Sequence, residues 1–435
     1  MKSYRSVMAG LAITIITVLA LNQPAHAETL ELSLEDSIAL TLKNNPSMKI
    51  AGAQKEKAAW TVKQAQAAKG ISLDYAYTQL RTDAPPSWVN QTVMWEVPYY
   101  NYFSNQISAT LPIYTGGKLE NTIAQAKKGS QAAVLNEDAM KQQLKLTATR
   151  AYFNLLQARN LRDIAKQSVD DFAAHLKNVQ NQFDAGTVAK VDVLQTKVQW
   201  ANAQDGLIKA QNSYEVAALT LNTVMGMPLY SEVKTKENLA YRPYLLTLEE
   251  CVETALSKRP EMEQAAVMIG AAKDQIKIYQ SDKLPTVALT ASAKWQDMKS
   301  PGWNYQTKNI TLLAKYNIFD SGRTEAQIKG GEAALTVAEE QAQQVRDAIS
   351  LEASSSYLTL KEAEKRIETS KTAVEHAEVD FVLSQERYEA GVGTNLDVID
   401  AELALAKART NYTQALYDYN TGKAMVERAM GSALK

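Results

Sequence analysis

Histidine and cysteine, which often bind metals or take part in catalysis, are few and scattered in this sequence. His175 and His376 each lie in a long polar segment, without another His or Cys close by. Because a metal site needs several such ligands together, we interpret both as ordinary helix residues. Cys251 is the one cysteine of the chain, so an internal disulfide framework is excluded. No metal or redox chemistry is predicted.

A glycine-rich stretch at Gly116-Gly117-Lys118 shares part of the pattern of a phosphate-binding loop. Pro112 stands where that loop requires its first glycine, and Leu119 stands where it requires Ser or Thr. Neither Gly-x-Ser-x-Gly nor Gly-x-Gly-x-x-Gly occurs, and a formal net charge of −1 gives no reason to expect a nucleic-acid partner. We therefore predict a protein that is not an enzyme, has no cofactor and binds no nucleic acid.

Two stretches, residues 183–194 and 388–399, share a spacing of aromatic, glycine and aspartate. The aromatic stands three positions before the glycine and the aspartate six positions after it, as Phe183, Gly186 and Asp192 in one stretch and Tyr388, Gly391 and Asp397 in the other. Glycine ends a helix in the left-handed conformation without a Cβ penalty. Thr394 and Asp397 have the spacing of a capping box. Both stretches are predicted to be helix–turn–helix tips, at about 185–190 and about 390–394.

The two tips belong to a tandem duplication. Leu32-Ser-Leu-Glu-Asp-Ser37 matches Leu246-Thr-Leu-Glu-Glu-Cys251, and further on Tyr152 matches Tyr357 and Met225-Gly226 matches Met430-Gly431. A shared order with a period of roughly two hundred residues indicates a duplicated unit rather than a solenoid. We divide the chain into repeat 1 at 28–228, a connector at 229–245 and repeat 2 at 246–435.

The first 27 residues have the features of a secretory signal peptide. Lys2 and Arg5 precede an apolar run, which is followed by the cleavage pattern Ala25-His26-Ala27. No later apolar run approaches the roughly 18 residues of a membrane-spanning helix. If the chain crosses a membrane, it must do so as a β-barrel.

Each repeat is predicted to open with two helices and to continue with two strands. Capping patterns begin at Ser33 and Thr247, and Pro46 and Pro260 suit the first position of a second helix. Alternating apolar and polar residues predict strands at about 71–80, 103–114, 285–296 and 307–319. The alternation fits a lipid-facing barrel wall and, equally well, a half-buried hairpin of a soluble domain. The aromatic-rich segment 85–100 is interpreted as a surface loop, either at a membrane boundary or packed on itself.

Long helices are predicted at about 118–184 and about 323–389, with return helices ending near 226 and 430. At 1.5 Å per residue, each long helix would extend for about 100 Å. Apolar residues repeat about every 3.5 positions near the tips, which predicts a left-handed coiled coil. The predicted coil positions are Ala165, Val169, Phe172, Leu176, Val179 and Phe183 against Val191, Leu194, Val198 and Ala201, and Val374, Ala377, Phe381, Ser384 and Tyr388 against Leu396, Ile399, Leu403 and Ala406.

Two copies of helix, strand, strand, long helix, tip and helix behind a signal peptide resemble the TolC-type outer-membrane efflux protein family. The resemblance covers essentially the whole mature chain, and the paired glycine–aspartate tips are its most specific part. It implies an α+β membrane protein, a homotrimer whose protomers each give four strands to one barrel of about 12 strands. A long α-helical coiled-coil tunnel would continue from this outer-membrane barrel into the periplasm.

The family's function implies a passive exit duct for efflux or secretion, recruited by a periplasmic adaptor and an inner-membrane transporter of the RND or ABC type. The independent physical support is that four strands alone cannot close around a pore, whereas three sets of four can. Closure also removes strand edges, which lipid does not tolerate. A coiled-coil envelope scaffold with a small β cap and no pore remains the alternative.

The resemblance also assigns roles at the tips. Tyr388 and Asp192 resemble the aromatic and acidic partners of a constriction network, and Asp397 and Asp400 resemble acidic rings that line the tunnel entrance. For Asp397 the alternative is a carboxylate favoured by the helix dipole alone, and for Tyr388 the last core position of the coil. Gly393 departs from the pattern, because some members have Arg there, so the cation of a salt bridge is missing.

The turns themselves resemble the surface on which the adaptor's hairpin docks in this family. They consist of small, uncharged residues: Gly186, Thr187 and Val188 in the first tip and Gly391, Val392 and Gly393 in the second. Small residues let another helical hairpin approach the backbone closely. The alternative is that the glycines act only as helix C-caps.

Overall fold

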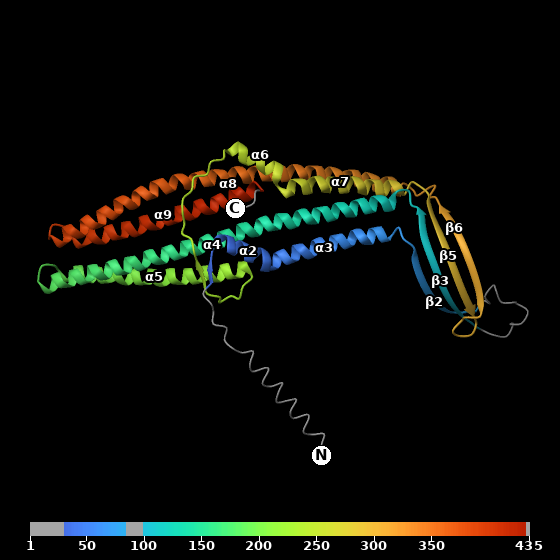
Figure 1. Cartoon of the computed structure of the whole chain (residues 1–435), viewed down its shortest axis with the longest axis horizontal. Helices are drawn as coiled ribbons and strands as arrows, with labels where there is room; N and C mark the ends of the chain where they lie inside the picture. The colour runs from blue at the N-terminus through green and yellow to red at the C-terminus, as the bar shows by residue number, and fades with distance from the viewer. Residues whose placement is uncertain (1–29, 84–98, 432–435) are drawn as a thin grey trace, which may run out of the picture.

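The protein is elongated, with a β-sheet at one end and two helical tips at the other (Figure 1). The computed structural model describes residues 30–83 and 99–431. The expected signal peptide at 1–27 lies outside the described residues, as does most of the aromatic-rich loop at 85–100.

The elements follow the order expected for a duplicated chain. Repeat 1 consists of α2 (Leu34–Asn44), α3 (Pro46–Ala67), β2 (Ser72–Thr82), β3 (Tyr100–Tyr114), α4 (Lys118–Asp184) and α5 (Lys190–Met225). Repeat 2 consists of α6 (Leu248–Lys258), α7 (Pro260–Ser281), β5 (Thr286–Asp297), β6 (Tyr305–Lys315), α8 (Arg323–Glu389) and α9 (Asn395–Ala429). Strand β6 is shorter than expected because its pairing ends where Lys315 meets Thr286, the first residue of β5.

Local sequence signals set the helix starts. The Ser33 side chain accepts a hydrogen bond from the Asp36 backbone, and the Asp36 carboxylate accepts one from the Ser33 backbone, which completes a capping box. Thr247 and Glu250 form the same box in repeat 2. Pro46 and Pro260 begin α3 and α7, where a missing backbone N–H costs nothing.

The four strands form one antiparallel sheet in the order β2-β3-β5-β6. Its register gathers like residues on each face, because directly paired residues share a face. One row across the sheet joins Leu73, Ala109, Ala291 and Ile310, and the neighbouring row joins Ser72, Thr110, Thr290 and Thr311. One face is therefore largely apolar and the other largely polar. The apolar face is open to solvent in a single chain, with Leu73 73% and Ile310 82% exposed.

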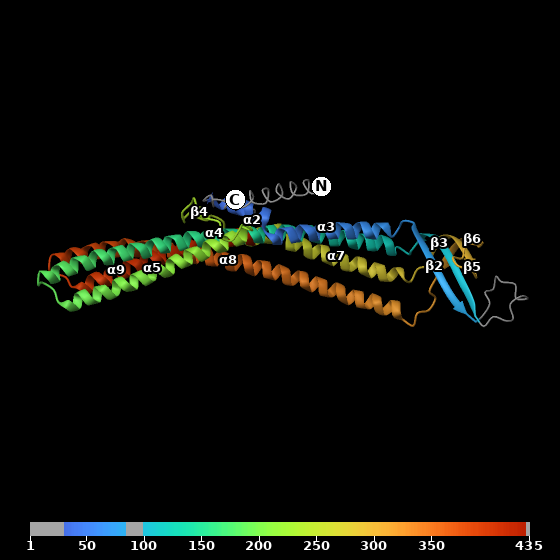
Figure 2. The same cartoon turned by 90° about the horizontal axis from the view of Figure 1, so that it is seen from below.

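Helices extend from the sheet in two segments. Next to the sheet, α3, α4, α7 and α8 lie side by side, and further away α4 pairs with α5 and α8 with α9 (Figures 1 and 2). We call the α4–α5 pair hairpin 1 and the α8–α9 pair hairpin 2. Hairpin 1 contacts hairpin 2 mainly where α4 packs against α9. In the described part of the chain, no helix combines the length and the apolar character needed to span a membrane.

The main hydrophobic core lies in the middle of the molecule, where the connector crosses the helices. Strand β1 (Leu30–Leu32) pairs in parallel with β4 (Val233–Thr235) of the connector. Tyr152 of α4 donates a hydrogen bond to the Leu32 carbonyl at 3.1 Å, and Tyr419 of α9 donates one to the Arg242 carbonyl at 2.6 Å. The connector thus binds both repeats together at the level of the core.

The buried face of α5 differs from the predicted coil positions. Phe172 and Val179 of α4 are buried as expected, but the residues of α5 that are buried near the tip are Val193 and Thr196. The predicted positions Val191, Leu194 and Val198 are 54%, 52% and 58% exposed. The prediction was wrong for these positions, because α5 buries Val193 and Thr196 and leaves the predicted stripe largely exposed in the single chain.

The same correction applies to α9. It holds there for two of the predicted positions, because Leu396 and Leu403 are 57% and 45% exposed, whereas Val398, Glu402 and Leu405 are buried. The predicted position Ile399 is buried as expected. Helix α9 packs against both α8 and α4, so its buried face is set by two neighbours rather than by one coiled-coil partner. The outward apolar residues remain uncovered in a single chain.

Candidate functional site at the helical tips

Both tips are closed by glycine C-caps. Gly186 and Gly391 adopt φ angles of 79° and 74°, the left-handed region in which a Cβ is strained. In tip 1 the Thr187 N–H donates to the Gln182 carbonyl at 3.0 Å, and in tip 2 the Val392 N–H donates to the Arg387 carbonyl at 2.9 Å. These hydrogen bonds satisfy helix-end carbonyls. The glycines therefore serve as C-caps, whatever else they do.

The predicted docking residues lie on the surface of the two turns. Val392 is 70% exposed, Gly186, Thr187 and Gly391 are exposed, and Val188 and Gly393 are half-buried. Gly393 has an additional role, because a Cβ there would lie 3.0 Å from the backbone nitrogen of Tyr388. An Arg at this position would disturb the turn, so the departure from the family pattern is built into the local backbone.

The predicted entrance carboxylates act differently in the two tips. The Asp397 carboxylate accepts a hydrogen bond from the Thr394 N–H at 2.9 Å and completes a capping box. Hydrogen bonds from the Thr394 backbone and side chain hold the pKa of Asp397 below its ordinary value. Asp192 accepts a hydrogen bond from the Ala189 N–H at 3.2 Å. The Ala189 side chain has no oxygen to accept a hydrogen bond in return, so the capping box is not completed. Asp400 is exposed one turn further along α9.

Tyr388 is buried between the two hairpins rather than bonded to Asp192. Its ring packs edge-on against the imidazole of His175, with centroids 5.2 Å apart. The Tyr388 hydroxyl is buried and has no hydrogen-bond partner among the described residues. Burial, followed by the nearby charge of Asp192, raises the pKa of Tyr388. Within one chain the expected pair is close but not hydrogen-bonded, and Tyr388 acts through packing.

Asn395 links the hairpins where the aromatic pair meets. Its Oδ1 atom lies 2.8 Å from Nε2 of His175 and 3.0 Å from Oγ1 of Thr196, and its Nδ2 donates to the Asp192 carbonyl at 3.3 Å. His175, Thr196 and Asn395 are all buried. Burial lowers the pKa of His175, opposed by its bond to Asn395. A neutral imidazole that donates from Nε2 fits this geometry.

Sequence reasoning had treated His175 as an ordinary helix residue and had not considered Asn395. In the repeat, His175 corresponds to Asp380 and Asn395 to Lys190. The link is therefore made once per chain, between unlike halves. The available signal was the break in the duplication at these positions.

A small cavity of about 280 Å³ opens beside this link, between α4 and α8. Its edge carries a further contact between the hairpins, in which Asn178 Nδ2 donates to Glu389 Oε1 at 3.2 Å. The lining residues are Ala174, His175, Lys177, Asn178, Asn181, Gln385, Tyr388 and Glu389.

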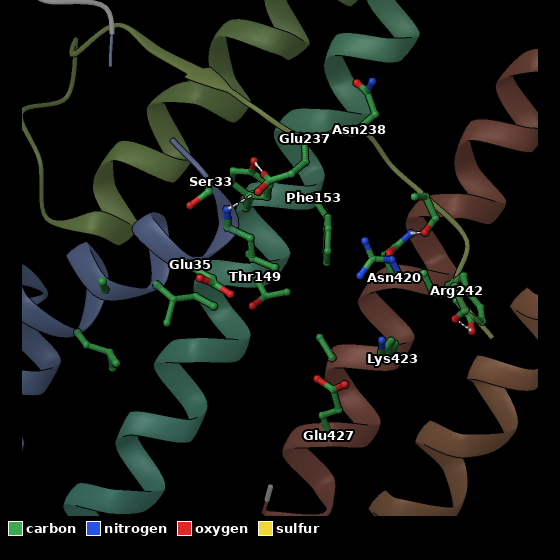
Figure 3. Close-up of a pocket in the computed structure, with 18 residues that line it drawn as sticks. Ser33, Glu35, Thr149, Phe153, Glu237, Asn238, Arg242, Asn420, Lys423 and Glu427 are labelled. Carbon is green, nitrogen blue, oxygen red and sulfur yellow. Dashed lines mark hydrogen bonds between the residues drawn. The ribbon is translucent and has the colours of Figure 1, made fainter. Parts of the chain in front are cut away.

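A larger cavity of about 750 Å³ lies at the level of the core, between α2, α4, α9 and the connector (Figure 3). Several of its polar groups hold the connector in place. Glu237 accepts bonds from the Leu34 N–H and from the Tyr152 hydroxyl, and Asn420 Nδ2 donates to the Ala240 carbonyl at 3.1 Å. Among the described residues, no group of three or more His, Cys, Asp or Glu side chains is placed to hold a metal ion.

Comparison with known proteins places this architecture in a family. The sequence model of the family described as "Outer membrane efflux protein" matches residues 38–227 and 251–432. The alkaline protease secretion protein AprF of Pseudomonas aeruginosa is 24% identical over 90% of this chain and 82% of its own length. The outer membrane protein TolC of Escherichia coli is 23% identical over 89% of this chain and 80% of its own length.

A solved structure gives the same fold. The Campylobacter jejuni CmeC outer membrane channel superposes with a TM-score of 0.80 at 18% identity, over 92% of this chain and 85% of that one. The family match favours a channel over the pore-free scaffold. The chain belongs to the outer membrane efflux protein family, the outer-membrane channels of efflux and secretion systems, with its helical part in the periplasm.

Proposed function

We propose that three copies of this chain form one passive exit duct in the outer membrane, which a periplasmic adaptor connects to an inner-membrane transporter. The observation that carries the proposal is the sheet. Among the described residues it has four strands, of which β2 and β6 are the edge strands, and one exposed apolar face. Neither a free edge nor an isolated four-stranded sheet is stable in lipid.

Closure of the sheet between copies removes both edges. In the described part of the chain, β2 pairs with β3 and β6 with β5, and no other strand pairs with either of them. Their residues are exposed along almost their whole length. Pairing β6 of one copy with β2 of the next would leave no edge and would turn the apolar row of Leu73 and Ile310 towards lipid. The polar row of Ser72 and Thr311 would face the lumen.

The uncovered apolar residues of the helices support the same assembly. Among the described residues, the stripe on α5 and the pair on α9 are about half exposed: Val191, Leu194 and Val198, and Leu396 and Leu403. Near the tips the helices lie in the order α5, α4, α9, α8, so α5 and α8 are the outermost. Helix α8 exposes Val379, Val382 and Leu383. Contact between α5 of one copy and α8 of the next would bury the exposed apolar residues of these two helices and continue the barrel as a helical tunnel.

The tips would then form the periplasmic entrance. Asp397 and Asp400 would line it as acidic rings, and Tyr388 and Asp192 would narrow it, with Tyr388 held by His175. The six turn residues from Gly186 to Val188 and from Gly391 to Gly393 would receive the adaptor. The named function of AprF, secretion of alkaline protease, illustrates one class of cargo in the family. Cargo here would be set by the transporter, because the duct is passive.

Assembly and conductance test this function together. Light scattering of the purified protein in detergent is expected to give a trimer, and planar bilayers are expected to show discrete channels. A stable monomer without detergent and without channels would support the scaffold instead. A trimer without channels would leave the assembly standing and overturn the duct.

A further inference from the structure

A buried carboxylate lies where hairpin 1 packs against hairpin 2, at the contact between α4 and α9 that we call the seam. Glu402 is on α9, two turns from the tip at Asn395, and only 3% of it is exposed. It lies on the face of α9 that packs against α4, and its Oε2 atom has no hydrogen-bond partner among the described residues. Neither the capping of the tips nor the entrance carboxylates use this group.

The charges around Glu402 do not balance it. The Ser168 hydroxyl of α4 lowers the pKa of Glu402, and Asp171, half-buried on the same helix, adds a second carboxylate. The positive charge that acts on Glu402 is Arg409 of α9, but its guanidinium bonds Glu378 of α8 at 2.9 Å.

Two other polar groups of the described chain near this part of the contact, His175 and Thr196, carry no compensating positive charge in this arrangement. His175, one turn beyond Asp171 on α4, is buried and bonded to Asn395. Helix α5 contacts Asn395 of α9 through the uncharged Thr196. An ionised Glu402 would therefore share the positive charge of Arg409 with the carboxylates of Asp171 and Glu378.

A buried ion without its own cation favours the neutral form. Burial raises the pKa of Glu402 to about 7, with the charge of Asp171 adding to the effect and Ser168 opposing it. Burial also raises the pKa of Asp171. The packed seam thus holds a proton that a hydrated carboxyl would release.

We propose that Glu402 is a proton-linked lock between hairpin 1 and hairpin 2, which stay packed while its carboxyl is protonated and separate more readily once it ionises. Any movement of α9 away from α4 hydrates this side chain. The consequence for gating rests on the proposed function as a duct, because separated hairpins would widen its entrance.

Linkage gives the direction of the pH effect. The pKa of Glu402 is higher in the packed seam than in the open one, so the packed seam binds the proton more tightly. Its stabilisation is complete below the ordinary carboxyl pKa and is lost as the pH rises through about 7. Alkaline conditions therefore favour separation of the hairpins.

Hydrogen exchange of the purified trimer tests the lock directly. Amide exchange in the seam segments 165–178 and 395–405 is measured from pH 6 to pH 8 and corrected for the intrinsic exchange rates. Relative to Glu402→Gln, the wild-type opening constant is expected to rise about tenfold over this range. Glu402→Gln keeps His175, Asp171 and the entrance carboxylates, so the difference between the two proteins isolates Glu402.

Two further variants sharpen the test. Glu375→Gln makes the same chemical change at an exposed position of α8 and should keep the wild-type response. Ser168→Ala removes the hydroxyl that lowers the pKa of Glu402, so the midpoint of the response should move to higher pH. A wild-type seam without pH response, or a response that survives in Glu402→Gln, would overturn the lock.

Single-channel recording of the same samples separates the two proposals. Channels whose open fraction follows the exchange data support both. Absent channels with a pH-responsive seam would overturn the duct alone. Working channels with an unresponsive seam would overturn the lock alone.

Discussion

Nε2 of His175 lies 2.8 Å from Oδ1 of Asn395, and this contact joins two halves of a duplicated chain through residues that the duplication does not repeat. The imidazole is held on its other side by the edge-on ring of Tyr388. Thr196 completes the group by bonding the same oxygen of Asn395 at 3.0 Å. The tip is therefore held by a buried polar link together with apolar packing.

Asn395→Ala should loosen this link. The substitution leaves the His175 N–H in a buried site without its acceptor, which costs about 1–3 kcal/mol, whereas the Thr196 hydroxyl keeps the Asp192 carbonyl as an acceptor at 2.8 Å. We expect faster hydrogen exchange at residues 172–180 and a higher open fraction in bilayers. Tyr388→Phe is the matched control and should behave like wild type, because it removes a hydroxyl that has no partner among the described residues. A gain of conductance in Tyr388→Phe but not in Asn395→Ala would contradict this assignment.

The His175 link should weaken in acid. Burial lowers the pKa of His175 in the folded tip, so its contribution is present above the unfolded pKa and is lost as the pH falls through the folded pKa. Thermal unfolding between pH 7.5 and pH 5 should show a loss of stability that His175→Gln reduces. His376→Gln, at the other helical histidine, should keep the wild-type slope. Equal slopes in all three proteins would exclude His175 as the titrating group.

Charge selectivity should depend on the two carboxylates of α9. Three copies each of Asp397 and Asp400 around one axis would favour cations and bind divalent ions. Asp397→Asn with Asp400→Asn should shift the reversal potential towards zero and weaken divalent block in bilayers. The hydrogen bonds that lower the pKa of Asp397 keep its charge into acid, so its share of selectivity should be lost only as the pH falls below the ordinary range. Asp205→Asn on the exposed surface of α5 is the control, and a double variant with wild-type selectivity would place the filter elsewhere.

Contact between copies should depend on the apolar stripe of α5. Leu194 is 52% exposed in the single chain, and a carboxylate there would be buried against the next copy at a cost of several kcal/mol per ion. Leu194→Asp is therefore expected to give monomers by light scattering in detergent. Leu194→Met conserves volume and apolar character and should remain trimeric. Trimers of normal stability in Leu194→Asp would show that this face is not buried.

Recognition of the adaptor should depend on the exposed turn of tip 2. Val392 contributes little to the fold, because it is 70% exposed, so Val392→Asp should leave expression, assembly and conductance intact. The added charge should prevent close approach of a partner and abolish adaptor cross-linking and export. Val392→Thr, which keeps the shape of the side chain, should retain both. Normal export from Val392→Asp would leave the glycines as simple C-caps.

Sequence alone determined the parts of this protein that depend on neighbours along the chain. Helices α4 and α8 occupy the predicted ranges 118–184 and 323–389, and the capping boxes at Ser33, Thr247 and Thr394 form as expected. A cap, a C-terminal glycine and an alternating strand pattern each involve residues a few positions apart. For the same reason the resemblance to the family could be recognised before any packing was known.

Tertiary structure decided which faces those elements bury. Val191 and Leu194 match a coiled-coil repeat in the sequence, but the residues that α5 buries are Val193 and Thr196. The periodicity of apolar residues predicts that a helix has an apolar stripe, but it does not say which neighbour that stripe contacts. The pairing of His175 with Asn395 and the burial of Glu402 join segments more than two hundred residues apart. Such contacts depend on how α9 packs between α4 and α8, and no local sequence pattern predicts that packing.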